Sequence, residues 1–526
     1  MTGAGAAELE IKLRLARSAV AAVLRHPALA AVKRGRARTA TLRSTYFDTE
    51  GGRLAKSGIG LRLRRDGRRW LQTLKGPLDA RSGAGLAARP EYEWPLRAGI
   101  AMPPVDAARF ALTPWRRKLD KAMREGLRPR FSTVFERTSV PLVFADSTMA
   151  MLAIDTGEIR AAAGGARVGV CEIEIELESG HAHNLFDLAR ALAQDLPVAL
   201  ETRSKAARGN ALLVPAPRTP VRAEDPELEG RSSTADALAA LLRSCVRQID
   251  ANADGVIHDD DPEWVHQMRI GTRRLRACLS LMRDLVPADM LAPLRAEARW
   301  LARTLGPVRD LDVLVDETLP AIATAVRGAS PGGRAPALRS LRTRAARQRT
   351  AARADARAAV ASRRFVRFLL AVGGFAARPR FGADEASAAA ATLALPARRV
   401  ARPVLKRRQR KLLDRGTNLP AATPAARHAA RLAAKRLRYA TEFFAALFPR
   451  RKTRAYRAAL ARLQELLGVM NDASMAADLA AGIAGEASPA AATLRGWAAA
   501  QAAARADALA DTWQDFNRAR PFWSGA

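Results

Sequence analysis

Residues 8–15 read Glu-Leu-Glu-Ile-Lys-Leu-Arg-Leu, and every even position is charged while every odd position is apolar. A β-strand places alternate side chains on opposite faces, so this stretch predicts a strand with one charged and one apolar face. The same alternation, or a run rich in strand-forming residues, recurs at 40–48, 61–64, 69–75, 91–94, 131–137, 149–155 and 171–178. About eight strands with little helix between them predict an α+β domain built on an antiparallel sheet or closed barrel.

The charges on these predicted faces are segregated by sign. Glu172, Glu174 and Glu176 share one face of their strand, whereas Arg62 and Arg64 share a face of another. A charged face turned to water is the ordinary explanation for one strand, but water does not require the signs to be separated. Carboxylates bind hard divalent cations, and cations bind phosphate oxygens. The pattern therefore points to a metal–phosphate site.

Glu8-x-Glu10-x-Lys12 resembles the ExExK signature of the CYTH superfamily, also called triphosphate tunnel metalloenzymes. Other segments follow in that family's order: Tyr46-Phe47-Asp48-Thr49, Arg62-Leu-Arg64, Thr73-Leu-Lys75-Gly76, Glu91-x-Glu93, Phe135-Glu-Arg137, Asp155-x-Gly157-Glu158, Glu172-x-Glu174-x-Glu176 and Ser204-Lys205. The resemblance implies an eight-stranded antiparallel tunnel that binds a triphosphate.

Site residues also follow from this resemblance. It implies that Mg²⁺ or Mn²⁺ is held by carboxylates drawn from Glu8, Glu10, Asp155, Glu172, Glu174 and Glu176. Which of the glutamates in 172–178 meet the metal stays open. Catalysis is implied for Glu8, Glu10, Lys12 and Lys75, and substrate binding for Arg62, Arg64, Arg137, Lys205, Glu91 and Glu93. The implied reaction is in-line attack by a metal-activated water on a terminal phosphorus, with the cations stabilising the leaving oxygens.

A Pro-rich polar segment then divides the chain. Residues 215–234 read PAPRTPVRAEDPELEGRSST, a composition typical of an interdomain linker. Strand-type alternation dominates before it and helical periodicity after it. We therefore expect a tunnel domain at 1–214, a linker at 215–231 and a helical domain at 232–526.

The helical domain contains an internal repeat. The pattern His266-x2-Arg269-x3-Arg273-Arg274-x-Arg276 returns 162 residues later as His428-x2-Arg431-x3-Lys435-Arg436-x-Arg438. At the same offset, Leu305-Gly306-x3-Asp310 pairs with Leu467-Gly468-x3-Asp472. A duplicated unit normally packs about a pseudo-two-fold axis, so we expect two helical bundles in halves 232–385 and 386–526.

Helical geometry places the repeated cations together. Positions 266, 269, 273 and 276 fall on one side of a helix, whereas Met268, Leu275, Leu279 and Met282 fall on the other. A solvated basic face is the ordinary explanation, but the repetition of the stripe favours a binding surface. Two such stripes related by a two-fold axis would form one basic groove.

These residues resemble the CHAD domain, the conserved histidine α-helical domain. The resemblance implies two antiparallel four-helix bundles that bind inorganic polyphosphate through His266, Arg269, Arg273, Arg274, Arg276, His428, Arg431, Lys435, Arg436 and Arg438. For Asp310 and Asp472 we expect helix capping after the glycine turns rather than chemistry.

Composition agrees with an anionic partner. The 526 residues carry 87 Lys and Arg against 52 Asp and Glu, a net charge of +35. We expect no membrane span and no signal peptide, and the three cysteines show no metal-type spacing. A cytoplasmic protein that can associate with polyphosphate granules is the resulting expectation. Aromatic residues make up only 5% of the chain, which argues against nucleic acid as the partner.

The leading hypothesis is an inorganic triphosphatase, hydrolysing tripolyphosphate to diphosphate and phosphate, joined to a polyphosphate-binding domain. Three alternatives stay open. The same tunnel could cyclise ATP or hydrolyse nucleoside or thiamine triphosphates, which needs an aromatic wall that Trp70, Trp94 and Trp115 are too scattered to predict. The protein could instead be a non-catalytic polyphosphate-granule protein, or the arginines could bind nucleic acid.

Overall fold

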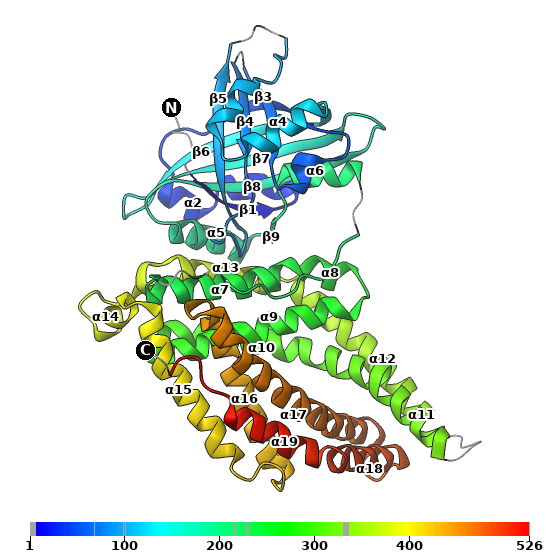
Figure 1. The fold of residues 1–526 in the computed structure, drawn as a ribbon. Helices are drawn as coiled ribbons and strands as arrows, with labels where there is room; N and C mark the ends of the chain where they lie inside the picture. Colours follow the sequence, from blue (N-terminus) through cyan, green and yellow to red (C-terminus); the bar gives the residue numbers. More distant parts are fainter. Residues whose placement is uncertain are drawn as a thin grey trace. The chain divides into compact units, whose positions relative to one another are not determined.

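The computed structural model describes residues 7–67, 69–97, 99, 101–214, 217–226, 228, 231–329 and 336–524. Residues 215–216, 227 and 229–230 of the predicted linker lie outside this set. The chain divides into two compact units (Figure 1). The first unit runs to Thr219 and also contains Ala361–Phe381, and the second comprises Pro220–Val360 and the chain from Gly382 onward.

One antiparallel sheet forms the body of the first unit. Its strands are β1 (Ala7–Arg14), β2 (Arg38–Asp48), β3 (Gly60–Asp66), β4 (Arg69–Lys75), β5 (Leu86–Leu96), β6 (Arg128–Val143), β7 (Met149–Ala161), β8 (Arg167–Ser179) and β9 (Ala199–Leu200). They follow the order β5-β4-β3-β2-β6-β7-β8-β1-β9, and β1 also pairs with β5. The β1–β5 pairing closes eight long strands into a barrel, so the predicted antiparallel tunnel is confirmed.

The barrel is polar inside and apolar outside. On β1, Ile11 and Leu13 are fully buried, yet Glu10 and Lys12 on the opposite face are also only 2% and 5% exposed. Helix α5 (His183–Asp195) packs on β1 and β8, and α6 (Lys205–Leu213) packs on β6 and β7. Helix α5 covers apolar outer faces, whereas α6 packs against the inward-facing Tyr46 and Phe131 and places Lys205 in the cavity lining, so the charged inner faces are enclosed rather than turned to bulk water.

Shorter helices complete the first unit: α1 (Val20–Leu24), α2 (Pro27–Val32), α3 (Arg53–Lys56) and α4 (Arg116–Arg124). Helix α4 lies in a region for which the sequence predicts no element. Its Leu119 packs with Phe110 against Leu61 of β3 and Leu74 of β4. This helix therefore closes one outer face of the barrel.

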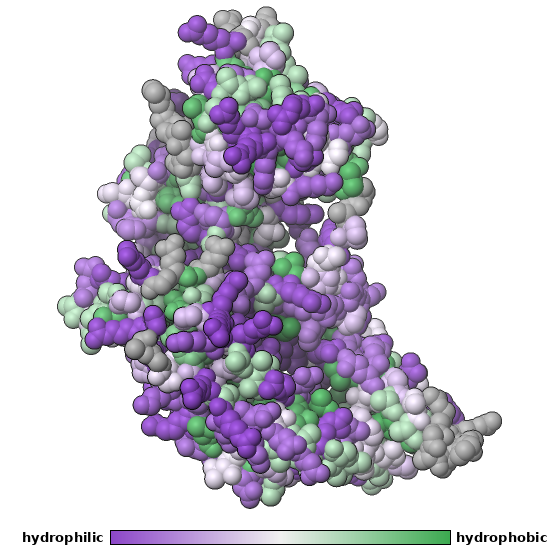
Figure 2. Space-filling model, in the orientation of Figure 1, coloured by the Kyte–Doolittle hydropathy of each residue, from purple (hydrophilic) through white to green (hydrophobic). Residues whose placement is uncertain are grey.

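The second unit is helical throughout its described elements. These are α7 (Thr234–Ala251), α8 (Ala253–His258), α9 (Pro262–Leu281), α10 (Ala288–Asp312), α11 (Leu319–Ala329), α12 (Pro336–Val360), α14 (Ala388–Ala394), α15 (Ala397–Gly416), α16 (Pro424–Phe444), α17 (Arg450–Ala484), α18 (Pro489–Ala503) and α19 (Ala506–Arg518). Helices α7, α9, α10 and α12 each pack on the next helix in this series, and α15, α16, α17 and α18 pack in the same order. The predicted helical domain is therefore confirmed, and the same order of helix packing occurs in both repeats. Hydrophilic side chains cover most of the visible face of the protein (Figure 2).

The expected half of 232–385 contains a segment that packs elsewhere. Helix α13 (Arg363–Ala377) lies against α5 and belongs to the first unit (Figure 1). Its apolar residues cover nearly every side of the helix, and Phe365, Leu369 and Phe375 are buried. Such a helix needs partners on more than one side, and α5 supplies one of them.

Candidate functional site

The barrel encloses a cavity of about 650 Å³ with a strongly charged lining. The charged lining residues on its strands and on α6 include Glu8, Lys12, Arg62, Arg64, Lys75, Arg89, Glu91, Glu93, Arg137, Glu174, Glu176 and Lys205. All of these except Arg89 are among the residues that the sequence predicts for the site. The predicted Glu10, Asp155 and Glu172 lie buried in the cavity wall and do not line it.

Strands β1, β5 and β8 bring one group of carboxylates together. We refer to Glu8, Glu10, Glu91 and Glu176 as the β1 carboxylates, because Glu8 and Glu10 lie on β1 and Glu10 is paired with Glu176 of β8. Lys75 Nζ lies 2.5 Å from Glu8 and 3.2 Å from Glu91. Even so, burial and the charge of Glu8 raise the pKa of Glu176 to about 7. This cluster carries surplus negative charge of the kind that a divalent cation neutralises.

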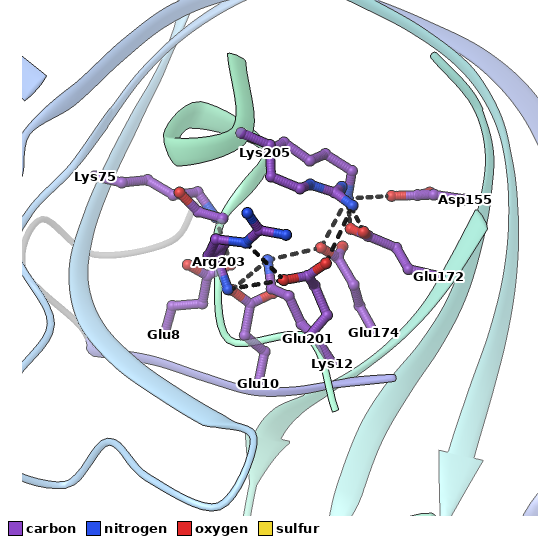
Figure 3. Close-up of polar contacts among 12 residues, drawn as sticks. Glu8, Glu10, Lys12, Lys75, Asp155, Glu172, Glu174, Glu201, Arg203 and Lys205 are labelled. Carbon is purple, nitrogen blue, oxygen red and sulfur yellow. Dashed lines mark hydrogen bonds and ion pairs between the residues drawn. The ribbon is translucent and has the colours of Figure 1, made fainter. Parts of the chain in front are cut away.

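A second acidic group surrounds the ammonium of Lys205. We refer to Asp155, Glu172 and Glu174 as the Lys205 carboxylates. Lys205 Nζ lies 2.7 Å from Asp155 and 2.9 Å from Glu174, and it also contacts Glu172 (Figure 3). One oxygen from each carboxylate lies within 4.8 Å of the others, a spacing that could hold a metal ion.

The two acidic groups differ in how far the protein neutralises them. Although burial opposes it, Lys205 and Arg137 lower the pKa of Asp155, and Lys12, Lys205 and Arg137 lower that of Glu174. The Lys205 carboxylates are therefore already compensated by protein cations. Among the β1 carboxylates, Lys75 and Arg89 likewise lower the pKa of Glu8, and Lys75 and Arg62 lower that of Glu91, although burial opposes both shifts. Glu176, with its raised pKa, is the member of this group that the protein leaves uncompensated, and a carboxylate of this kind suits a hard divalent cation.

A cationic wall lines another part of the cavity. The Nε atoms of Arg62 and Arg64 are buried and have no hydrogen-bond partner among the described residues. Burial, Arg62 and Arg137 lower the pKa of Arg64 to about 10. Tyr46 hydrogen-bonds to Arg62, and the pKa of its hydroxyl falls because Arg62, Arg64 and Lys205 outweigh its burial. Like charges that crowd together with unsatisfied donors form a site for an anion.

The second unit carries a basic groove formed by two adjoining cavities of about 300 and 290 Å³. They share Ser280, Arg283, Arg408 and Arg436. The groove is lined by cations from α9, from the short 3₁₀ helix Met282–Asp284 that follows it, and from α10, α15 and α16, namely Arg273, Arg276, Arg283, Arg295, Arg299, Arg407, Arg408, Lys411, Arg415, Lys435 and Arg436. Both repeats therefore contribute to a single basic surface, with Arg273 and Lys435 at corresponding positions.

Sequence comparisons identify two domain families along the chain. Residues 6–209 match the CYTH domain model and residues 240–481 match the CHAD domain model. The chain joins a CYTH domain to a CHAD domain. An inorganic triphosphatase from Haemophilus influenzae is 34% identical over 168 residues, which is 32% of this chain and 45% of that protein. The match thus spans less than half of the relative's length.

Two solved structures resemble single domains. The CHAD domain from the plant Ricinus communis is 32% identical and covers 58% of this chain and 98% of its own, with a TM-score of 0.49. A Hippeastrum protein described as having a dominant triphosphatase activity is 20% identical and covers 39% of this chain and 95% of its own, with a TM-score of 0.27. No helix in the described part of the chain is both long and apolar enough to span a bilayer.

Three charged residues that shape the CYTH tunnel were not predicted from the sequence, namely Arg89, Glu201 and Arg208. Arg89 on β5 donates to Glu10 Oε1 at 2.7 Å and to Glu8 Oε2 at 3.3 Å, so it holds both ExExK glutamates. Arg208 on α6 donates to Glu172 at 2.6 Å and lies 3.5 Å from Glu201. The alternation Arg89-x-Glu91-x-Glu93 was a usable signal for Arg89, because the three side chains share one face of a strand.

The repeated stripes of the CHAD domain separate into residues with different surroundings. Arg273, Arg276, Lys435 and Arg436 line the basic groove. Met268, Leu275, Leu279 and Met282 are fully buried, as the helical geometry predicts. Arg438 instead pairs with Glu442 at 2.6 Å. His428 contacts Asn471 at 2.8 Å, and burial together with Arg309 lowers the pKa of His266.

Arg274 points away from the groove. It is 3% exposed and donates to Gln248 at 3.2 Å and to the Glu224 carbonyl at 3.1 Å. The predicted polyphosphate role does not suit this position. Arg274 holds a segment that precedes α7 against the bundle, because it donates both to the Glu224 carbonyl of that segment and to Gln248 of α7.

The expectation for Asp310 and Asp472 was wrong. Both Leu-Gly segments lie inside the continuous helices α10 and α17, so there is no glycine turn and no cap. Asp310 lies 3.4 Å from Arg269, and Asp472 lies 3.2 Å from Arg431. Arg269 also donates to the Gly306 carbonyl at 2.8 Å. The repeated Asp therefore orients the repeated Arg of the neighbouring helix.

Proposed function

We propose that the CYTH tunnel hydrolyses inorganic triphosphate to diphosphate and phosphate with Mg²⁺ or Mn²⁺. The single observation that carries this proposal is the polarity of the cavity, in which the buried Nε donors of Arg62 and Arg64, which have no hydrogen-bond partner among the described residues, share one lining with Glu8, Glu91 and Glu176. A triphosphate presents oxygens to the arginines and to the metal together. The 34% identity to a triphosphatase supports the same activity.

Each part of the lining has a defined task in this reaction. Arg62, Arg64 and Arg137 bind phosphate oxygens and stabilise the charge that develops on the leaving group. Glu8 and Glu176 in the lining, together with Glu10 in the wall beside them, would hold the cation, which supplies charge neutralisation when it is bound. Lys12, which lies 3.0 Å from Glu10 and 2.9 Å from Glu174, and Lys75 orient these carboxylates and reach the cavity themselves.

The aromatic residues argue against a nucleotide or thiamine substrate. Tyr46 and Phe135 are the aromatic side chains among the described lining residues. The face of the Phe135 ring is already occupied by a cation, because Lys205 Nζ lies 5.1 Å from the ring centroid. Trp94 and Trp115 pack in the outer core next to α4 rather than in the cavity. The Tyr46 ring is stacked on Phe131, with ring centroids 4.6 Å apart, so a base would find no unoccupied ring among the described lining residues.

A panel of phosphate compounds tests the proposal. Purified full-length protein with Mg²⁺ or Mn²⁺ should release phosphate from tripolyphosphate at least about tenfold faster than from ATP or thiamine triphosphate, because neither base nor thiazolium gains a contact. Product identification by ³¹P NMR should give diphosphate and phosphate. Formation of cyclic AMP from ATP, or binding without metal-dependent turnover, would overturn the assignment.

We also propose that the CHAD domain binds inorganic polyphosphate in the basic groove, which would favour association with polyphosphate granules. Its lining combines cations from both repeats with one aromatic ring, that of Tyr439, among the described residues. Phosphate oxygens suit this surface, whereas nucleobases would lack stacking partners. Competition tests the assignment, since DNA should scarcely displace bound polyphosphate.

Polyphosphate affinity should fall as the pH rises from 7 to 9. Burial, Arg431 and Arg273 lower the pKa of Lys435 to about 8, so this ammonium is charged below pH 8 and becomes neutral above it. Loss of one charge-assisted contact of about 1.5 kcal/mol weakens binding roughly tenfold. Titration calorimetry at constant ionic strength measures the decline.

Lys435→Arg is the matched variant, because an arginine at this position stays charged and should flatten the profile. Arg273→Lys tests the corresponding position of the other repeat. An unchanged pH profile in Lys435→Arg would show that another group controls the decline.

A further inference from the structure

Helix α13 is held against α5 at both of its ends. Arg363 at the start of α13 donates to the carbonyl of Asp195, the last residue of α5, at 3.2 Å. Arg378, just beyond the end of α13, donates to Asp187 of α5 at 2.6 Å. A guanidinium at the C-terminal end of a helix is also favourable for the helix dipole. The two contacts fix the register of an antiparallel helix pair.

Two glycines let this pair approach closely. A Cβ atom at Gly373 would meet the Phe186 ring at 2.3 Å and the Ala84 Cβ at 2.8 Å, and one at Gly374 would meet Phe186 at 3.0 Å. Phe186 of α5 is 2% exposed. The glycine face of α13 therefore receives the ring of Phe186 and also touches the loop between β4 and β5.

The loop that Gly373 contacts is hydrogen-bonded to the backbone of Lys12. Ala84 has φ of +54°, a left-handed conformation that non-glycine residues hold only when their surroundings enforce it. The carbonyl of the next residue, Gly85, accepts a hydrogen bond from the backbone amide of Lys12 at 3.3 Å. On the other side, the Lys12 carbonyl accepts from the Glu201 amide at 3.0 Å, and α13 packs on the adjoining β9.

We propose that α13 is a positioning element of the CYTH tunnel, although its sequence lies within the CHAD region. It supports the Ala84–Gly85 loop, which in turn sets the position of the Lys12 backbone on β1. Lys12 Nζ contacts both Glu10 and Glu174, so a displaced β1 alters cavity groups without any substitution in the cavity. The effect on turnover rests on the triphosphatase function proposed above, whereas the effect on β1 does not.

Gly373→Ala in the full-length chain tests this inference. Alanine is the better helix former, so helix propensity alone predicts no loss. The added methyl group, however, must displace Phe186 or Ala84. We expect the turnover number for tripolyphosphate to fall at least about tenfold, since misplacement of a catalytic group by 1 Å can cost ~10²-fold. Hydrogen exchange of the β1 amides, measured by mass spectrometry, should become faster.

Gly482→Ala in α17 is the matched control, because a Cβ there meets nothing within 4 Å. It should leave turnover and β1 exchange unchanged. Adding Phe186→Leu to Gly373→Ala should partly restore the turnover number and partly slow the β1 exchange, since it removes the ring atoms that the methyl group meets. If Gly373→Ala does not fold, Arg378→Asp with rescue by Asp187→Arg provides the same test through the end contact.

The possible outcomes are distinct. Wild-type turnover and wild-type β1 exchange in Gly373→Ala would overturn the inference. Absence of tripolyphosphate hydrolysis in the wild-type protein would overturn the proposed function instead, and β1 exchange would still decide whether α13 positions Lys12.

Discussion

Replacing Glu8 and Glu10 together by glutamine should reduce phosphate release from tripolyphosphate by at least about 10³-fold, because a metal supplies several kcal/mol of transition-state stabilisation. Glutamine keeps the shape of the side chain and can still accept hydrogen bonds from Arg89 and Lys75, so the barrel should remain folded. The negative charge that attracts the cation is lost. Steady-state phosphate release and Mn²⁺ binding followed by electron paramagnetic resonance measure the two effects.

Glu136→Gln is the control for this double variant. Glu136 lies on β6 of the same barrel, but its side chain is exposed and outside the cavity lining. It should retain full turnover and metal affinity. More than a tenth of wild-type turnover in the double variant at saturating metal would contradict the assignment of Glu8 and Glu10 to the metal.

Lys205→Met should destabilise the first unit by about 3–5 kcal/mol, the typical loss when one partner of a buried ion pair is removed. Lys205 is 6% exposed, and its ammonium contacts all three Lys205 carboxylates. Without it these carboxylates remain buried with less compensation. Turnover should fall by at least about 10²-fold as well, since one oxyanion-stabilising donor contributes roughly that factor.

The stability loss in Lys205→Met should depend on pH in a defined direction. In the wild type, Asp155 and Glu174 have lowered pKa values, so their contribution to stability is present above pH ~4 and is lost at lower pH. Removal of Lys205 raises these pKa values, so the difference between variant and wild type should be largest near neutral pH and should shrink in acid. Urea unfolding at several pH values measures it.

Lys118→Met provides the comparison, because Lys118 is an exposed lysine on α4. It should change stability by less than about 0.5 kcal/mol at any pH, as is typical for surface substitutions. A Lys205→Met protein with wild-type stability at pH 7 would contradict the view that this ammonium compensates the buried carboxylates.

The local pattern of the sequence predicted most of the barrel and much of its lining. Alternation in residues 8–15 was sufficient for β1, because a strand has a two-residue period that does not depend on its partners. The helical period likewise assigned Met268 and Leu275 to a core. It could not show that Arg274 also points inward, because the buried acceptors of Arg274 lie 26 and 50 residues earlier in the chain.

The alternation of charged and apolar residues could not show which glutamates of β8 are paired with protein cations. Glu172, Glu174 and Glu176 share a strand face, yet Glu172 is buried behind Lys205, Glu174 is shared between Lys12 and Lys205, and Glu176 lies beside Glu8 and Glu10. Their differences come from the residues brought opposite them by strand register and by α6. Those neighbours lie far away along the chain.

By itself, the sequence determined an antiparallel sheet, the repeated basic helices and the residue types of a phosphate site, because these follow from local periodicity and from motifs of a few residues. Only the tertiary structure decided which carboxylates are already neutralised, that Arg89 holds Glu8 and Glu10, and that α13 packs in the first unit. Electrostatic balance and close packing depend on distances between segments remote in sequence, and a local pattern carries no information about those distances.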